Sequence, residues 1–192
     1  MNPLKKILLG LLLILLVAGG VHSCLGGEGS YDPEKYETVI TPAPAQDEEG
    51  ESKPAVAGLR VGSKVDLTLP DQFGVAHTIG PDTTTLIMAF TKGTGGLVRG
   101  YLDGQDAEFL SSHQASFIAD ISSIPTFVRN ALALPKLRKS PYSVLLLYEK
   151  EQTKALKNIE HEDEIAIVTL SKGVVVSLKH IQTEEELAGI LE

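Results

Sequence analysis

The stretch TTLIMAF, residues 84–90, decides the fold of this chain. Its apolar residues run from Leu86 to Phe90 without a polar interruption. An unbroken run of this kind, preceded by β-branched threonines, is typical of a strand that is buried on both faces. Such strands lie in sheets that carry helices on their faces, so the run predicts the centre of an α/β domain.

Upstream of this strand the sequence predicts a hairpin. Residues 64–69 (KVDLTL) alternate between polar and apolar side chains, as a half-buried strand does. The segment 70–74 (PDQFG) has the composition of a turn, and residues 75–79 can return as a second short strand.

Downstream, strand-like and helix-like segments alternate. A glycine-rich loop over Thr91–Gly96 leads into a helix over 97–102 that residues 105–112 extend. Ser123 is the predicted cap of a later helix, and Thr183 forms a predicted capping box with Glu186 in the last one. The further elements are strands at 116–121, 142–148, 164–170 and 174–179, and helices at 123–134 and 183–191. The last two strands are predicted to pair as a hairpin, with Lys172-Gly173 in a tight turn between them. This order predicts an α/β domain with a mixed sheet over residues 60–192.

The beginning of the chain has the pattern of an export leader, residues 1–24. Lys5 and Lys6 precede an uncharged apolar run from Ile7 to Val21. That run is shorter than the roughly 20 residues that a membrane-spanning helix needs. Positive charge before the run predicts that the rest of the chain is delivered outside the cytoplasm. We therefore expect a cell-envelope protein that is anchored to a membrane and faces the periplasm or the cell exterior.

The single cysteine, Cys24, directly follows the apolar run. Residues 21–24 (VHSC) resemble a bacterial lipoprotein cleavage box except at His22. Lipid modification of Cys24 would hold the mature protein firmly to a membrane. Two alternatives are open: cleavage after Ser23 that gives a soluble product, and an uncleaved anchor from Ile7 to about Leu25. A lone cysteine cannot form an internal disulfide.

Residues 25–59 are a predicted tether. They are rich in glycine and proline, include the acidic run Gln46–Glu51, and contain few large apolar residues. Such a segment cannot bury enough surface to offset its ordering entropy, so we expect it to be disordered. As a flexible coil it would span on the order of 33 Å.

The overall charge limits the classes of partner. The formal net charge is −8, and the domain has no basic stripe. Affinity for nucleic acid rests on the neutralisation of phosphates, so the composition argues against a nucleic-acid partner. Tryptophan is absent, and the core is expected to consist of Leu, Ile and Val.

Residues 65–192 resemble thioredoxin-like proteins of the peroxiredoxin and TlpA-like branch. The segment Leu69–Gly74 (LPDQFG) is similar to the hairpin that precedes the first central strand in those proteins, and residues 84–90 are similar to that strand. The stretch from Phe117 to Leu146 resembles an exported, YtfJ-like subgroup. The resemblance implies a thioredoxin-like mixed β-sheet that is flanked by helices and preceded by an N-terminal hairpin.

One departure from that family bears on function. Where its redox members carry Cys-x-x-Cys or a peroxidatic cysteine, this chain reads TKGTGG at residues 91–96. Thiol–disulfide exchange requires a thiolate that attacks sulfur. The sequence therefore excludes thiol–disulfide oxidoreductase and thiol peroxidase chemistry in the domain. It predicts a redox-inactive binding or accessory module rather than an enzyme.

The resemblance also implies where a partner would bind. In thioredoxin-like proteins the loop after the first central strand lies beside a loop that carries a cis-proline. The corresponding residues here, with the basic segment Lys136–Lys139 leading in, are Thr91, Lys92, Gly93, Thr94, Gly95, Gly96, Ser140 and Pro141. We predict that the Ser140–Pro141 bond is cis and that these loops form a groove for an extended segment of another envelope protein. The alternatives are a tight turn and a trans proline that starts a strand.

No catalytic site, cofactor site or metal site is predicted. Four histidines of the domain do not occur at the spacings of metal ligands: His77, His113, His161 and His180. Asp120 and Ser122 lack a nearby histidine and a nucleophile elbow, so a strand-end hydrogen bond and helix capping explain them. Two other functions stay open: a thiol-independent oxidoreductase with a bound cofactor such as flavin, and a structural envelope lipoprotein.

Overall fold

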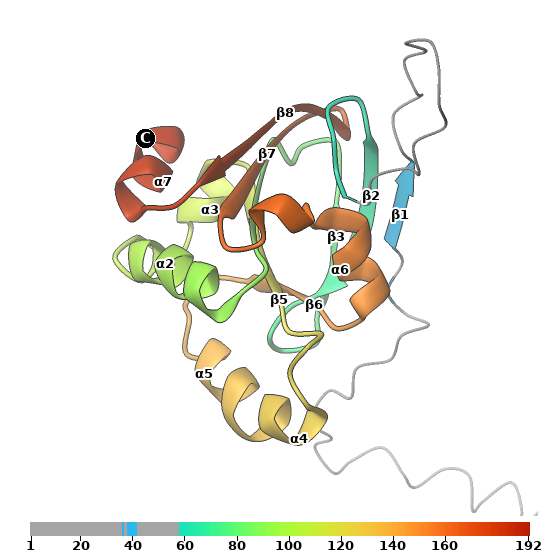
Figure 1. The fold of residues 1–192 in the computed structure, drawn as a ribbon. Coiled ribbons are helices and arrows are strands. Elements are labelled where there is room, and N and C mark those ends of the chain that lie inside the picture. Colours follow the sequence, from blue (N-terminus) through green and yellow to red (C-terminus); the bar gives the residue numbers. More distant parts are fainter. Residues whose placement is uncertain (1–35, 37, 42–57) are drawn as a thin grey trace, which may run out of the picture. The chain divides into compact units, whose positions relative to one another are not determined.

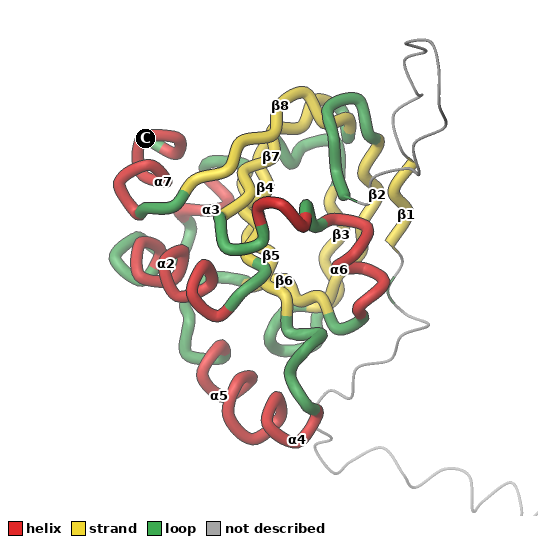
Figure 2. The backbone as a smooth tube through the Cα atoms, viewed as in Figure 1, coloured by secondary structure: helices red, strands yellow, loops and turns green. Residues whose placement is uncertain are grey.

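The structure, a computed structural model, describes Tyr36, residues 38–41 and residues 58–192 (Figure 1). The predicted leader, Cys24 and most of the predicted tether lie outside these residues. Within the part of the chain that is described, no helix is both long and apolar enough to cross a membrane. The described residues form a mixed β-sheet with helices on its faces (Figure 2).

Eight strands make up the sheet. They are β1 (Thr38–Thr41), β2 (Lys64–Pro70), β3 (Ala76–Ile79), β4 (Thr85–Ala89), β5 (Ala115–Asp120), β6 (Val144–Leu147), β7 (Ile165–Ser171) and β8 (Val174–Ile181). The strand order is β1-β2-β8-β7-β4-β5-β6, and β3 pairs with β2. The α/β class, the mixed sheet and the hairpin before the central strand are as the sequence predicted.

The stretch that decides the fold is the central strand β4. It pairs in parallel with β5 on one side and antiparallel with β7 on the other. Leu86 and Met88 belong to one buried cluster, and Ile87 and Ala89 belong to a second cluster on the opposite face. The unbroken apolar run is thus explained by burial on both faces.

The helices follow the predicted order with three differences. Their bounds are α2 Lys92–Leu102, α3 Phe109–Ser112, α4 Thr126–Val128, a π-helix Arg129–Ala133, α5 Leu134–Leu137, α6 Lys150–Leu156, a 3₁₀-helix Ile159–His161 and α7 Glu184–Leu191. The sequence did not predict α6, because its buried face includes the polar Gln152 and Thr153 and shows weak apolar periodicity. The predicted bounds of the helix after β4 are wrong at both ends. α2 already begins at Lys92, and residues 105–112 do not extend it, because it ends at Leu102 and α3 is a separate helix.

The third difference concerns the helix predicted over 123–134 with Ser123 as its cap. The helical segment instead starts at Thr126, with Pro125 in the N-cap position, and continues to Leu137. Pro135 does not end it, because the π turn before it is wider than an α turn and the proline lies in the first turn of α5. We call residues 126–137 the helical arm.

The predicted turn of the C-terminal hairpin and the predicted cap of the last helix are both present in the structure. Lys172 and Gly173, with φ of 51° and 77°, form the turn between β7 and β8. Two consecutive positive φ angles are the signature of a tight hairpin turn. Thr183 and Glu186 form the predicted capping box at the start of α7.

The turn of the β2–β3 hairpin is held by Asp71. Its Oδ1 accepts hydrogen bonds from the backbone N–H groups of Phe73 (2.8 Å) and Val75 (2.9 Å), and its Oδ2 lies 3.0 Å from His77 Nε2. Gly74 has a φ of 81°, which favours glycine. The LPDQFG segment therefore has a structural explanation in this chain.

Gln72, in the same turn, joins the hairpin to the far side of the sheet. Its side-chain amide donates to the carbonyl of Tyr142 (2.8 Å) and accepts from the N–H of Val144 (2.8 Å). The side chain thus pairs with the outer edge of β6 as a neighbouring strand would. The start of β2 bonds to β8 at Lys64, and the turn after β2 bonds to β6 through Gln72. β2 and its turn therefore connect β8 with the outer strand β6.

The strand β1 shows that part of the predicted disordered tether belongs to the sheet. Residues 38–41 lie inside the segment 25–59 that was predicted to be a disordered tether, yet they pair antiparallel with β2. The sequence TVIT is rich in β-branched residues, which favour strands. Tyr36, just before it, is buried and donates its hydroxyl to the carbonyl of Gly74 (3.0 Å).

Candidate functional site

The candidate site lies where the parallel strands β4 and β5 end. The helix α2 follows β4 there, and the helical arm follows β5. Met88 of β4 pairs with Ala166 of the antiparallel strand β7, so β7 begins at the same edge. Loops at the carboxyl ends of parallel strands are the usual place for ligand sites in α/β proteins. We call residues 90–94, 121–126 and 161–164 together the carboxyl edge.

Thr91 and Thr94 organise the first turn of α2. Thr91 is the N-cap, and its Oγ1 accepts from the N–H of Thr94 (3.2 Å). Thr94 in return accepts at its Oγ1 from the N–H of Thr91 (3.1 Å). This reciprocal capping starts the helix in spite of the glycines. Sequence reasoning missed it because glycine disfavours helix interiors.

The two threonines stand three residues apart, which is also the spacing of the cysteines in a Cys-x-x-Cys motif. Their hydroxyl oxygens lie 3.1 Å apart. Thr94 is buried and Lys92 is exposed. Hydroxyl groups cannot carry out thiol–disulfide exchange, which needs a thiolate.

Ser140 and Pro141 lie at the opposite edge of the sheet. Val144, the first residue of β6, pairs with Phe117 near the start of β5, so Pro141 is at the amino ends of the parallel strands. The structure thus does not bring Ser140–Pro141 together with Thr91–Gly96 in one groove. Every peptide bond in the described residues is trans, so the predicted cis bond at Pro141 is wrong. The reason is topological: Pro141 precedes the outer strand β6, whereas the antiparallel neighbour of β4 is β7.

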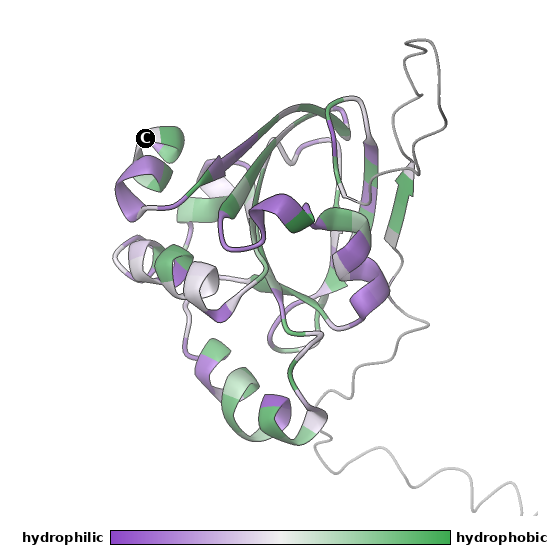
Figure 3. Cartoon of the chain, in the orientation of Figure 1, coloured by the Kyte–Doolittle hydropathy of each residue, from purple (hydrophilic) through white to green (hydrophobic). Residues whose placement is uncertain are grey.

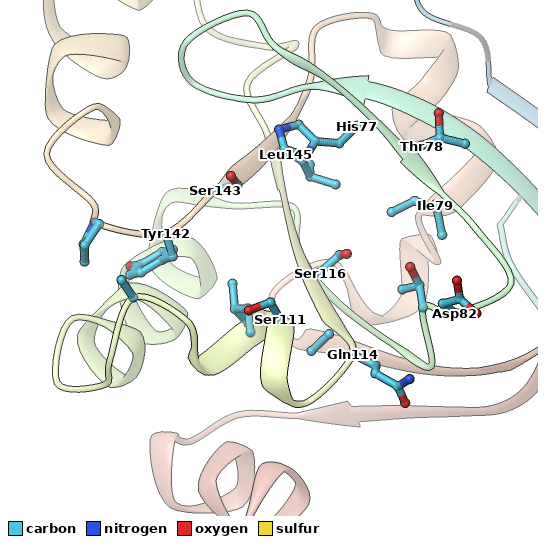
Figure 4. Close-up of a pocket in the computed structure, with 15 residues that line it drawn as sticks. His77, Thr78, Ile79, Asp82, Ser111, Gln114, Ser116, Tyr142, Ser143 and Leu145 are labelled. Carbon is cyan, nitrogen blue, oxygen red and sulfur yellow. The ribbon is translucent and has the colours of Figure 1, made fainter.

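A hollow of about 480 Å³ lies at this opposite edge, and Pro141 is part of its wall (Figure 4). Two of its polar groups already have partners. His77 contacts Asp71, and the Tyr142 hydroxyl donates to Asp103 Oδ1 (2.8 Å). Burial, with the Asp103 bond, raises the pKa of Tyr142 to about 12. A phenol of this kind is a poor acid or base near neutral pH, so we do not place the functional site here.

The helical arm presents apolar side chains to solvent. Phe127 is 82% exposed and Leu132 is 68% exposed, and Val128 is exposed as well. Leu134 and Leu137 are buried and attach the arm to the core on the α2 side of the sheet. Figure 3 shows apolar colouring along this segment, which projects from the sheet.

The charge around the helical arm is positive although the protein is acidic. No acidic residue occurs between Asp120 and Glu149. Arg129 lies over the Tyr148 ring at 4.7 Å, and Arg138 donates from Nε to the carbonyl of Gln72 (3.1 Å). Lys136 and Lys139 are exposed, so the basic segment Lys136–Lys139 consists of two surface lysines and one arginine, Arg138, whose side chain bonds to the hairpin turn.

Two histidines and a glutamate meet at the carboxyl edge, which the sequence did not predict. His161 Nδ1 lies 3.1 Å from Glu164 Oε2, and the rings of His161 and His180 stack with centroids 4.1 Å apart. The pairing of Ala166 with His180 across the β7–β8 hairpin brings the third residue in. The available signal was the His161-x-x-Glu164 spacing in front of a predicted hairpin.

These groups have shifted pKa values. Desolvation, and then the charge of His161, lowers the pKa of His180. A hydrogen bond from Gln182 lowers the pKa of Glu164, with a smaller effect from His161. The lowered pKa values favour an ionised carboxylate at Glu164 and a neutral ring at His180.

Asp120 and Ser122 have structural roles at the same edge. Asp120 Oδ1 accepts from the N–H of Ser122 (2.8 Å), which is the predicted strand-end bond. The Ser122 hydroxyl lies 3.2 Å from Thr153 Oγ1 rather than capping the next helix.

No protein-family model and no curated protein matches the sequence. Solved structures do match. StoA from Bacillus subtilis is 16% identical, with 66% of this chain and 96% of that chain covered and a TM-score of 0.45. A thio-disulfide isomerase from Thermus thermophilus is 15% identical (69% and 95% covered, TM-score 0.43). A peroxiredoxin-like protein from Aquifex aeolicus is 8% identical (70% and 86% covered, TM-score 0.43). These structures share part of their fold with this chain.

Proposed function

We propose that this chain is a redox-inactive, thioredoxin-like binding module that is held at the cell envelope. The observation that carries the proposal is the start of α2, where two hydrogen-bonded threonines occupy the Cys-x-x-Cys spacing. The only cysteine, Cys24, belongs to the predicted leader. A module of this kind acts by contact with another molecule, so its function depends on an exposed binding surface.

The helical arm is the binding surface in this proposal. Phe127, Val128 and Leu132 are the large apolar side chains that the arm exposes to solvent. Exposed apolar patches on soluble domains commonly mark protein–protein contacts. Lys136 and Lys139 border the patch at one end. The partner that fits is an envelope protein with an apolar groove that carries acidic side chains at its rim.

Site-specific photo-cross-linking in cells tests the surface. A photoreactive residue replaces Phe127, and a matched one replaces Phe73, which is also exposed but lies in the hairpin turn. We expect a cross-linked protein from position 127 that is absent from position 73. The product should weaken when Leu132→Glu, or Lys136→Glu with Lys139→Glu, is introduced into the same chain.

Three results would contradict the proposal for the helical arm. Products with lipid only would assign the arm to the membrane surface, and a product of twice the chain's mass would assign it to a second copy. A protein product that is insensitive to the Leu132 and lysine changes would show that the arm does not determine the contact.

A second experiment tests the assignment of Thr91 and Thr94. In a Cys24→Ser background, Thr91→Cys with Thr94→Cys should close a disulfide on oxidation, because the hydroxyls they replace are already in contact. We expect this variant to reduce insulin, whereas the wild type does not. If the two cysteines stay reduced under oxidising conditions in a normally folded chain, the helix start does not have the dithiol geometry.

A further inference from the structure

Three potential metal ligands converge at the carboxyl edge from separate elements. His161 ends the 3₁₀-helix, Glu164 directly precedes β7, and His180 lies near the end of β8. One ligand atom from each of the three lies within 4.8 Å of the others. The hairpin register fixes this juxtaposition, because Ile165 pairs with Ile181 and Ala166 pairs with His180.

The chemistry of the donors selects the kind of ion. Two imidazoles and one carboxylate are a donor set of zinc sites that keep a coordination position open. Calcium and magnesium prefer sites made of oxygen atoms only, so they fit this set poorly. Copper and nickel also accept imidazole ligands.

The surroundings favour a cation. Glu160 and Asp163 are exposed beside the cluster, and they help to line an open hollow of about 590 Å³. Glu162 is already paired with Lys157 at 2.6 Å. The excess of acidic groups creates a negative local potential that attracts positive ions.

Glu164 is held by a further contact. Gln182 Nε2 donates to Glu164 Oε1 (2.9 Å), which leaves Oε2 facing His161. Such outer contacts commonly orient metal ligands. The imidazole rings lie nearly parallel, at 16°, so one ring must rotate before both nitrogens point at a common ion.

We propose that His161, Glu164 and His180 bind a transition-metal dication, with Zn²⁺ as the first candidate. The site would leave one coordination position open to water or to a donor atom of another molecule. It lies at the same sheet edge as Thr91 and Thr94. It does not depend on the binding role of the helical arm.

Calorimetric titration of the full chain with ZnCl₂ tests this site. The chain carries Cys24→Ser, so that no thiol competes for the ion. We expect saturable binding of one Zn²⁺, and MgCl₂ in excess should not displace it. His161→Gln and His180→Gln should each weaken the affinity at least about tenfold. His113→Gln, a matched change of an exposed histidine, should bind as the wild type does.

A second readout keeps the test valid if one variant is unstable. Zn²⁺ should shift the imidazole NMR signals of His161 and His180 in the otherwise unaltered protein and leave those of His113 in place. Urea unfolding shows which variants are folded. The absence of saturable Zn²⁺ binding would overturn the proposal, and so would folded His161→Gln and His180→Gln variants that bind as tightly as the wild type.

Discussion

The turn of the β2–β3 hairpin and the helical arm use their side chains in opposite ways. In the turn, Asp71 is 4% exposed and Gln72 is 2% exposed, and both bond to backbone groups. In the arm, Phe127 is 82% exposed and Leu132 is 68% exposed. The turn carries the LPDQFG segment that resembles the hairpin of thioredoxin-like proteins, whereas the arm was predicted only as a helix over 123–134.

This contrast separates residues that fold the chain from residues that are available to a partner. Buried polar groups are costly unless they are hydrogen-bonded, so the LPDQFG segment is constrained by the fold alone. Exposed apolar side chains contribute little to folding. The four predictions below compare hydrogen-bonding side chains that hold the fold with an exposed apolar side chain of the arm, and each gives a change in the free energy of unfolding.

The largest expected effect is that of Gln72→Ala. The change leaves the carbonyl of Tyr142 and the N–H of Val144 without their buried partner. Each such group costs about 1–3 kcal/mol, so we expect a loss of about 3 kcal/mol in urea unfolding. Gln182→Ala, which removes an exposed glutamine, should cost less than about 0.5 kcal/mol. Equal losses for both variants would contradict the structural role of Gln72.

The helix start comes next. Thr91→Ala removes the cap of α2 and should destabilise the protein by about 1 kcal/mol. Thr91→Ser keeps the hydroxyl and should remain within a few tenths of a kcal/mol of the wild type. If the alanine and serine variants unfold at the same urea concentration, the cap does not hold the helix.

Tyr142→Phe should have a smaller effect at neutral pH, about 0.5–1 kcal/mol, because its partner Asp103 is exposed and water can replace the bond. Its contribution also depends on pH. The pKa of Tyr142 is raised from 10.0 to about 12, so the unfolded chain loses this proton first. The contribution of the Tyr142 hydroxyl to the free energy of unfolding is therefore complete below pH 10 and is lost as the pH rises towards 12. Burial raises the pKa of Tyr101 and Tyr148 too, so the measure is the difference between wild-type and variant slopes.

The smallest effect is expected in the helical arm. Leu132→Ala should change the free energy of unfolding by less than about 0.5 kcal/mol. Leu134→Ala, two residues further along the same segment but buried, should cost at least about 2 kcal/mol. A large loss from Leu132→Ala would show that this side chain serves the fold and is not free for a partner.

The features that could be predicted from the sequence have local causes. The apolar run at 84–90, the Lys172-Gly173 turn and the Thr183–Glu186 capping box each depend on neighbouring residues. The Thr91–Gly96 segment was predicted to be a loop because of its glycines. Its threonines start the helix, and the packing of Val98 and Leu102 supports it.

The features that could not be predicted depend on the pairing of distant strands. Pro141 was assigned to a cis-proline loop because it precedes a buried strand, but that strand is β6 rather than the neighbour of β4. His161 and His180 are nineteen positions apart in sequence and meet only through the register of β7 and β8. A helix over 123–134 was predicted from its capping residue, but the position of the arm in the fold, and hence its exposed side, was not.

The bonds between Gln72 and β6 also bear on solubility. β6 is an outer strand of the sheet, and an unpaired outer strand is a template on which another chain can add a strand. The Gln72 amide occupies backbone groups at the beginning of that strand and thereby denies them to a second molecule. If Gln72 were replaced by a residue without an amide, the backbone groups of Tyr142 and Val144 would be unpaired at the edge of the sheet. We expect such a protein to aggregate by edge-to-edge strand pairing, even among molecules that remain folded.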